Sequence, residues 1–213
     1  MKYLIFTLTI LWSIGLYSQS ADSIDFKSSI MRITNDATSI YYYPKLKDKI
    51  KNHPSEITTD DCYYLYYGQI FQKDYEPLSF VANPERPAFD KAVMNGNCGK
   101  ILGLGISILN RNPVDLTVLL HVANCIKEEK QADTTSFFGQ RFKNLLDAIL
   151  LTGDGKAMKS AIRIVNMGDD YILKGVIGFL GGKENHAFES NRVYSIWEKN
   201  GQKLYFEDVM NVK

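Results

Sequence analysis

The stretch from Asp61 to Phe71 constrains the fold most, because no other part of the chain is as dense in large side chains. Four tyrosines surround one leucine, and a glycine lies one helical turn after Tyr64. On a helix these side chains cover nearly the whole circumference, which favours a position inside a bundle. Buried phenol hydroxyls need hydrogen-bond partners, and a glycine lets a neighbouring helix approach. The stretch therefore predicts the central helix of the fold, with Leu65, Gly68 and Phe71 buried.

The first 20 residues indicate a secretory signal peptide. Lys2 is followed by an apolar run over residues 3–17 and then by small residues, as in a cleaved export signal. The alternative is a transmembrane anchor, but a run of about 15 residues is shorter than the roughly 20 that span a bilayer. We therefore expect an exported protein, periplasmic or secreted, that begins at Gln19 or Ala21 and has no stable membrane insertion.

The charge of the chain is balanced. The 25 basic residues include Lys2, so the rest of the chain has 24 basic and 24 acidic residues, mixed along its length. This balance argues against nucleic acid or an anionic membrane as the main partner. Hydrophobic residues make up 45% of the chain, which suits one domain of two packed layers.

Apolar residues recur at helical spacing along most of the chain before residue 155. Residues 21–35 are interpreted as a short helix or an extended arm, and residues 78–87 as a loop. Thr58 followed by acidic residues is a typical helix start, and Pro44 suits the first turn of a helix. The expected helices cover residues 39–52, 59–73, 89–94, 98–109, 114–127 and 135–150.

Two of these helices resemble a tetratricopeptide helix–turn–helix. The first, over residues 98–109, is rich in small residues, and the second, over 114–127, carries Leu and Ala three and four residues apart. The turn Asn110 to Pro113 joins them. The chain shows no clear self-similarity at the tetratricopeptide period of about 34 residues, so we interpret the pair as tetratricopeptide-like and not as an array.

The pattern after residue 155 is typical of strands. Asn200 and Gly201 are typical of a two-residue hairpin turn, and residues 167–173 suggest a short helical connector. The fold class is therefore α+β: a signal peptide over 1–20, a helical layer over 21–155, and a small antiparallel sheet over 156–213 packed on the helices as one domain. The expected strands lie at residues 161–165, 176–180, within 186–197 and at 204–206.

Three stretches, taken in order, are similar to a known family. They are Tyr41 to Leu46, Tyr64 to Pro77 and Leu151 to Gly155, followed by a closing Leu204 to Phe206. Together they resemble the exported Bacteroidota family described as domain of unknown function 4919, over nearly the whole mature chain. The resemblance implies an exported protein of unassigned activity. One departure is that the family's His-Glu-Tyr is replaced by Asp169 to Tyr171, so any role of that histidine is absent.

The three cysteines leave several interpretations open. Cys62, Cys98 and Cys125 are odd in number, so at least one thiol is free. Their apolar surroundings favour small buried side chains, and a single disulfide is compatible with the count, but spacing does not choose the pair. His121 and Cys125 lie four apart on one predicted helix, so thiol catalysis is a minor alternative. Buried thiols are inert, which argues against it.

Motifs for familiar catalytic and metal chemistry are missing. His53, His121 and His186 are far apart in the sequence, and no Cys-x-x-Cys or His-Glu-x-x-His occurs. Ser107 lacks the flanking glycines of a nucleophile elbow, and Gly103 to Gly105 is an incomplete dinucleotide motif inside a predicted helix. The sequence therefore predicts no catalytic residue, no metal site and no cofactor.

The segment from Thr152 to Lys156 joins the helical half to the sheet. The structural interpretation is a helix stop, with Gly153 in the left-handed conformation and a turn that leads into the first strand. The functional alternative places Asp154 across a cleft from Asp169 and Asp170. Carboxylates gathered there would raise a pKa or attract a cation.

Two functions follow from these observations. The favoured one is a non-catalytic binding or interaction module of the cell envelope, whose partner is an envelope protein or a small ligand. The alternative is an enzyme with carboxylate chemistry at the junction of Asp154, Asp169 and Asp170. The binding module would use a helical groove or the tyrosine-rich layer, and the enzyme would use the junction. The candidate ligand-binding residues are Asp154, Lys156, Asp169, Asp170, Tyr66 and Tyr67.

Overall fold

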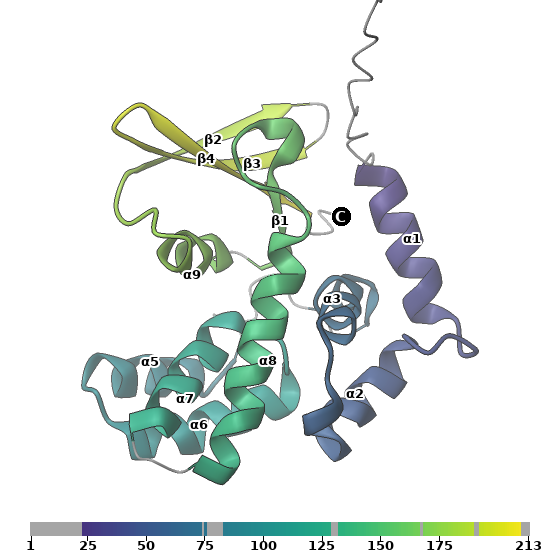
Figure 1. Cartoon of the computed structure of the whole chain (residues 1–213), viewed down its shortest axis with the longest axis vertical. Helices are drawn as coiled ribbons and strands as arrows, with labels where there is room; N and C mark the ends of the chain where they lie inside the picture. Colours follow the sequence, from purple (N-terminus) through teal and green to yellow (C-terminus); the bar gives the residue numbers. More distant parts are fainter. Residues whose placement is uncertain are drawn as a thin grey trace, which may run out of the picture.

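The structure is a computed structural model, and it describes residues 23–73, 75, 83–128, 132–166, 168–189 and 192–209. The predicted signal peptide lies outside these residues, as do residues 78–82 of the predicted loop at 78–87. The loop prediction is wrong for the last two residues, because the helix α5 (Arg86–Met94) already begins at Arg86. Helices occupy the lower part of the molecule in Figure 1, and a sheet lies above them. The predicted α+β fold, with a helical N-terminal part and a small C-terminal sheet, is confirmed.

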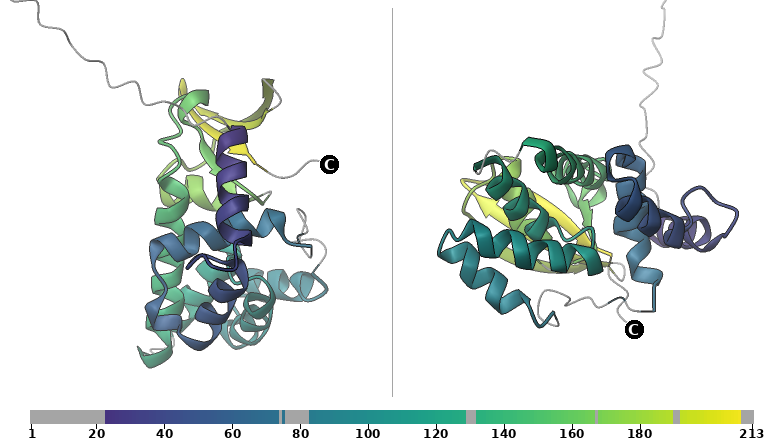
Figure 2. Two further views of the ribbon diagram at one scale, coloured as in Figure 1. Left: turned by 90° about the vertical axis from the view of Figure 1, so that its right-hand side faces the viewer. Right: turned by 90° about the horizontal axis from the view of Figure 1, so that it is seen from below.

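The helical layer contains α1 and α2 on one flank and α5 to α8 on the other, as the view from below in Figure 2 shows. α3 lies between the two groups (Figure 1). None of the helices in the described ranges is long and apolar enough to cross a bilayer. The helices are α1 (Ser23–Asn35), α2 (Tyr43–Asn52), α3 (Thr59–Gly68), α5 (Arg86–Met94), α6 (Cys98–Arg111), α7 (Leu116–Glu128) and α8 (Ala132–Leu150).

The tyrosine-rich helix α3 is central, as predicted. Thr58 caps its first turn: the Thr58 hydroxyl accepts from the Asp61 backbone N–H, and the Asp61 carboxylate accepts from the Thr58 N–H. Leu65 is fully buried, and Gly68 is buried against side chains of α1 and α2. Phe71 is only partly buried, contrary to the prediction, because α3 ends at Gly68 and the chain continues as a 3₁₀ turn over Gln69–Phe71.

The predicted helix over residues 39–52 is shorter in the structure. α2 begins at Tyr43, and Ser39 to Tyr42 form turns before it. A helix from Ser39 would need a hydrogen bond from the backbone nitrogen of Pro44, which has no hydrogen. Ile40, expected to face inward, is therefore 75% exposed.

A disulfide joins the helix pair α6 and α7. Cys98 at the start of α6 is bonded to Cys125 near the end of α7, and Cys62 is the free, buried cysteine. The interpretation of all three as free buried side chains is therefore wrong for Cys98 and Cys125. Thiol catalysis by Cys125 beside His121 is excluded as well, because Cys125 has no thiol to ionise.

The sheet has the strand order β1-β4-β3-β2. The prediction of a purely antiparallel sheet is wrong for one pair: β1 runs parallel to β4, with Ile162 opposite Phe206. The hairpin is confirmed, since Asn200 and Gly201 have φ values of 51° and 76° and join β3 to β4. The strands are β1 (Ile162–Ile164), β2 (Lys183–Glu189), β3 (Arg192–Lys199) and β4 (Gln202–Asp208).

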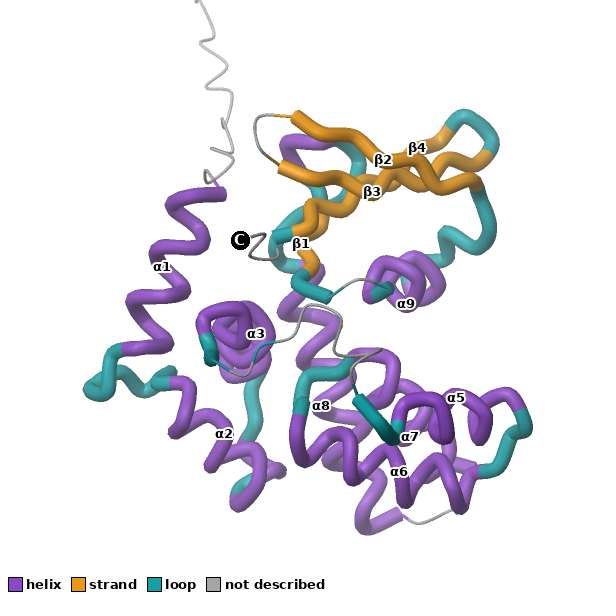
Figure 3. Tube along the Cα trace, turned by 180° about the vertical axis from the view of Figure 1, so that it is seen from behind, coloured by secondary structure: helices purple, strands orange, loops and turns teal. Residues whose placement is uncertain are grey.

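The predicted strand at residues 176–180 is not formed. The helical connector predicted at 167–173 is formed as the helix α9 (Asp169–Val176), which continues to Val176, the first residue of the predicted strand. Gly178 has a φ of 82° and turns the chain, so Ile177 and Leu180 stay exposed. The apolar composition of residues 176–180 is typical of a buried strand. The positive φ of Gly178, just after α9, is instead typical of the end of a helix. Figure 3 shows α9 between the sheet and the lower helices.

Candidate functional site

Asp169 is buried at the first turn of α9, where two elements provide its hydrogen-bond partners. The Tyr66 hydroxyl of α3 donates to Asp169 Oδ2 at 2.6 Å, and the Asn166 side-chain amide donates to the same oxygen at 3.2 Å. The Tyr66 oxygen in turn accepts from the backbone N–H of Val165 at 3.1 Å. This network ties the central helix to the end of β1 and the start of α9.

Burial controls the protonation of this pair. Loss of water around the Asp169 carboxyl raises its pKa to about 7, against the hydrogen bond from Tyr66, which lowers it. The pKa of Tyr66 is raised well above its usual value, again mainly by burial. Tyr67, also fully buried, donates its hydroxyl hydrogen to the carbonyl of Arg163 at 2.9 Å. The hydroxyls of Tyr66 and Tyr67 therefore form buried hydrogen bonds from α3 to α9 and β1.

Asp170 faces the sheet instead. Its carboxyl accepts from the indole N–H of Trp197 on β3 at 2.8 Å, and burial raises its pKa. The Lys174 ammonium lies 2.9 Å from the centroid of the Trp197 ring and 4.6 Å from that of Tyr171. This cluster holds α9 under the sheet.

Asp154 is exposed and shapes its own turn. Its carboxylate accepts from the Lys156 backbone N–H at 3.0 Å and from the Ser160 hydroxyl at 2.7 Å. These hydrogen bonds lower the pKa of Asp154. The predicted left-handed conformation belongs to Gly155, with a φ of 68°, and not to Gly153. Gly153 is required for another reason: a Cβ there would lie 2.3 Å from the Ser160 carbonyl oxygen.

The structure does not gather the three acids of the predicted junction. A shallow cavity of about 940 Å³ is lined by Asp154, Lys156 and apolar residues that include Ile177 and Phe179, which follow α9. Neither Asp169 nor Asp170 is among the described residues that line it. The neighbouring charges that raise the pKa of Asp169 are those of Asp115 and Asp170. Ligand binding by Asp154, Lys156, Asp169, Asp170, Tyr66 and Tyr67 stays a prediction.

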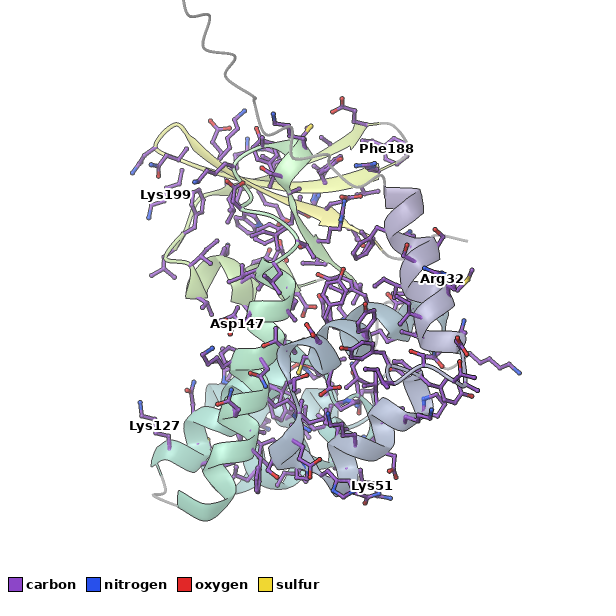
Figure 4. The ribbon with its side chains drawn as sticks, turned by 45° about the vertical axis from the view of Figure 1, so that its right-hand side comes forward. Arg32, Lys51, Lys127, Asp147, Phe188 and Lys199 are labelled. Carbon is purple, nitrogen blue, oxygen red and sulfur yellow. A yellow bond between two sulfur atoms is a disulfide. The ribbon has the colours of Figure 1, made fainter. Side chains whose placement is uncertain are left out.

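A groove of about 740 Å³ opens between α2, α6 and α8, and we call it the α2–α6–α8 groove. Its volume is that of a typical small-molecule site. Figure 4 places Lys51, one of its lining residues, at the end of the molecule opposite the sheet residues Phe188 and Lys199. The lining is Lys47, Asp48, Ile50, Lys51, Pro54, Ile106, Leu109, Asn110, Pro113, Phe137, Phe138 and Arg141.

Arg141 is the unusual member of this lining. It lies on the inner face of α8 and is only 9% exposed. Its Nε atom is buried and has no hydrogen-bond partner within the described part of the chain. Its guanidinium lies 4.9 Å from the centroid of the Phe138 ring, one turn earlier on the same helix. A buried side-chain donor without a partner is rare in native structures.

No carboxylate compensates the charge of Arg141 among the residues that the structure describes. Burial lowers the pKa of the Arg141 guanidinium to about 10, which leaves it protonated at neutral pH. The one titratable group that opposes this shift is the thiol of Cys62. Burial raises the pKa of that thiol to about 12, so Cys62 is neutral and does not balance the charge. The groove thus contains an uncompensated buried cation.

The mouth of the groove adds further positive charge. Lys47 and Lys51 lie on successive turns of α2, and neither forms an ion pair within the described ranges. Among the described residues of the lining, Asp48 is the one acidic residue, and its carboxylate accepts from the side chain of Asn52 at 2.6 Å. The groove therefore favours an anion over a cation.

Sequence reasoning missed Arg141, although the sequence contains a signal for it. Arg141 follows Phe138 by three residues and precedes Leu145 by four, so it shares their buried helix face. A single arginine on an apolar face needs a counter-charge or a ligand. The groove itself was not visible in the sequence, because its walls come from three separate helices.

The similarity of this chain to a known protein family extends over nearly the whole fold. The chain has no match among curated proteins and none among solved structures. A family described as a domain of unknown function, DUF4919, matches residues 28–210, which span the helical layer from α1 onward and all strands of the sheet. Since the match covers most of the sequence, the chain belongs to the DUF4919 family.

Proposed function

We propose that this protein is an exported, non-catalytic binding module of the cell envelope, and that it binds a small ligand in the α2–α6–α8 groove. The observation that supports the proposal most strongly is the buried charge of Arg141, which no carboxylate of the described residues compensates. Burying a cation without a partner costs several kcal/mol in order of magnitude, so a fold with no use for it would place an apolar residue there. A bound anion would supply the missing partner.

Two features support the exported location. The N-terminal pattern is that of a signal peptide, and the chain forms a disulfide between Cys98 and Cys125. Disulfides persist in oxidising compartments such as the periplasm and are rare in the cytosol. The intact mass of the protein from the envelope or the medium tests this: we expect a chain that begins at Gln19 or Ala21. Recovery of the Met1 form from the membrane would contradict it.

The binding role is tested on protein isolated from its own envelope fraction. Native mass spectrometry of the wild-type chain should show an additional bound mass. Arg141→Met should lose that mass, because methionine fills similar space without the charge. Lys143→Met is the matched control, since Lys143 lies on the same helix but is exposed and pairs with Asp147. A bound mass that survives in Arg141→Met, or no bound mass at all, would contradict the proposed site.

A further inference from the structure

We infer that the ligand of the α2–α6–α8 groove is an amphiphilic monocarboxylate: one carboxylate head on an acyl or aromatic body. This inference rests on the proposed function and adds the chemical class of the ligand. It follows from three observations, which concern the number of buried cations, the donors that are left unused, and the nature of the walls.

The buried charge calls for one negative charge. Arg141 is the one deeply buried cation of the lining, whereas Lys47 is partly exposed and Lys51 is exposed. A monoanion beside Arg141 matches its single buried charge, whereas the second charge of a dianion would have to be balanced by the more exposed Lys47 and Lys51. Asp48, on the α2 wall beside Lys47, would repel that second charge.

The free donor of Arg141 suits a carboxylate. Nε has no hydrogen-bond partner among the described residues, and together with a neighbouring terminal nitrogen it forms the planar fork that binds both oxygens of a carboxylate. The centroid of the Phe138 ring lies 4.9 Å from the guanidinium carbon of Arg141, and the ring holds the guanidinium by a cation–π contact. This contact uses the face of the guanidinium, so its N–H groups can still donate hydrogen bonds to a ligand. The head of the ligand is therefore placed at the α8 wall.

The other walls suit an apolar body. Ile50, Ile106, Leu109 and Pro113 line the groove together, and Ile106 is 40% exposed. A ligand of this kind would place its apolar part across α6 and α2. Lys47 and Lys51 at the mouth would attract the anion during approach.

The test uses the mature chain, residues 21–213, stripped of bound compounds, in titration calorimetry below micellar concentrations. The probes are sodium decanoate, decyl phosphate, decanol and sodium acetate. We expect one decanoate to bind per chain, and the other three probes to bind at least about tenfold more weakly, because each lacks the matched head or the body. Decyl phosphate or decanol binding as tightly as decanoate would overturn the inference.

Two pairs of variants locate the site. Arg141→Met should weaken decanoate at least about tenfold, since a hydrogen-bonded charge pair is lost, and Lys143→Met should leave the affinity unchanged. Ile106→Asp should also weaken decanoate binding, because this substitution puts a carboxylate in the groove. Ile40 is exposed but does not line the groove, so Ile40→Asp should leave the affinity unchanged. Equal loss in a variant and its control would contradict the site.

The two levels of the proposal fail in different ways. If the chain from the envelope carries a compound that Arg141→Met loses, yet decanoate does not bind, the ligand class is wrong and the proposed function stands. If no compound is carried and no probe binds, both are wrong.

Discussion

The Tyr66 hydroxyl donates a 2.6 Å hydrogen bond to the carboxyl of Asp169, and both groups are buried. The bond joins the centre of the helical layer to the first turn of α9, across 103 positions of sequence. It explains why a tyrosine, and not a phenylalanine, suits this position of α3. It also couples the stability of the fold to pH through Asp169.

The first prediction concerns that coupling. Folding raises the pKa of Asp169 from its usual 3.8 to about 7, so the folded state holds its proton more tightly than the unfolded state. This contribution to stability is full below about pH 4 and is lost as the pH rises through about 7, on the order of 4 kcal/mol at most. Urea unfolding of the wild type between pH 4.5 and 8 should show the decline.

The variant Asp169→Asn should show a smaller decline over the same range, because asparagine does not titrate. Asp115 and Asp170, whose pKa values burial also raises, retain part of the effect in the variant. Equal pH dependence in the wild type and in Asp169→Asn would show that Asp169 does not control it.

The second prediction concerns the packing of α3. A Cβ at Gly68 would lie 2.8 Å from the Thr34 methyl carbon and 3.1 Å from the Tyr43 ring. Gly68→Leu should therefore lower the free energy of unfolding by about 1–3 kcal/mol or more. Gly103→Leu is the matched control on α6, where no atom lies within 4 Å. Chemical denaturation should show the control to be unchanged or slightly stabilised; comparable losses in both would refute close packing at Gly68.

The third prediction concerns the hairpin. Gly201 has a φ of 76°, and no atom would obstruct a Cβ there, so a substitution acts through the backbone alone. Gly201→Val should lower the stability by about 1 kcal/mol or more, because β-branched residues disfavour positive φ. Gln202→Val, the next residue and exposed on β4, should be close to neutral. Similar melting temperatures for Gly201→Val and the wild type would argue against this strain.

Sequence patterns predicted the parts of the fold that local chemistry determines. The central α3 followed from its density of tyrosines, its start from Thr58, and the β3–β4 turn from Asn200 and Gly201. The prediction of a strand at residues 176–180 is wrong, because a short apolar run does not distinguish a strand from the end of a helix. There the outcome depended on the backbone of Gly178.

The features that were missed depend on contacts between distant segments. Pairing of Cys98 with Cys125 needs α6 and α7 to lie antiparallel, which spacing alone does not establish. The α2–α6–α8 groove likewise exists only once three helices are assembled. Arg141 was visible on an apolar helix face, but only the three-dimensional structure shows that no carboxylate of the described residues pairs with it.

The most direct test of the account is the unfolding free energy of ligand-free wild type against ligand-free Arg141→Met, measured by urea denaturation at pH 7. If the partner of Arg141 is a bound ligand, removing the arginine charge from the ligand-free protein should leave the stability unchanged or raise it. Decanoate should then stabilise the wild type and not the variant. A loss of about 3–5 kcal/mol in the ligand-free variant, as when a paired buried charge is broken, would contradict the account and make Arg141 a structural residue.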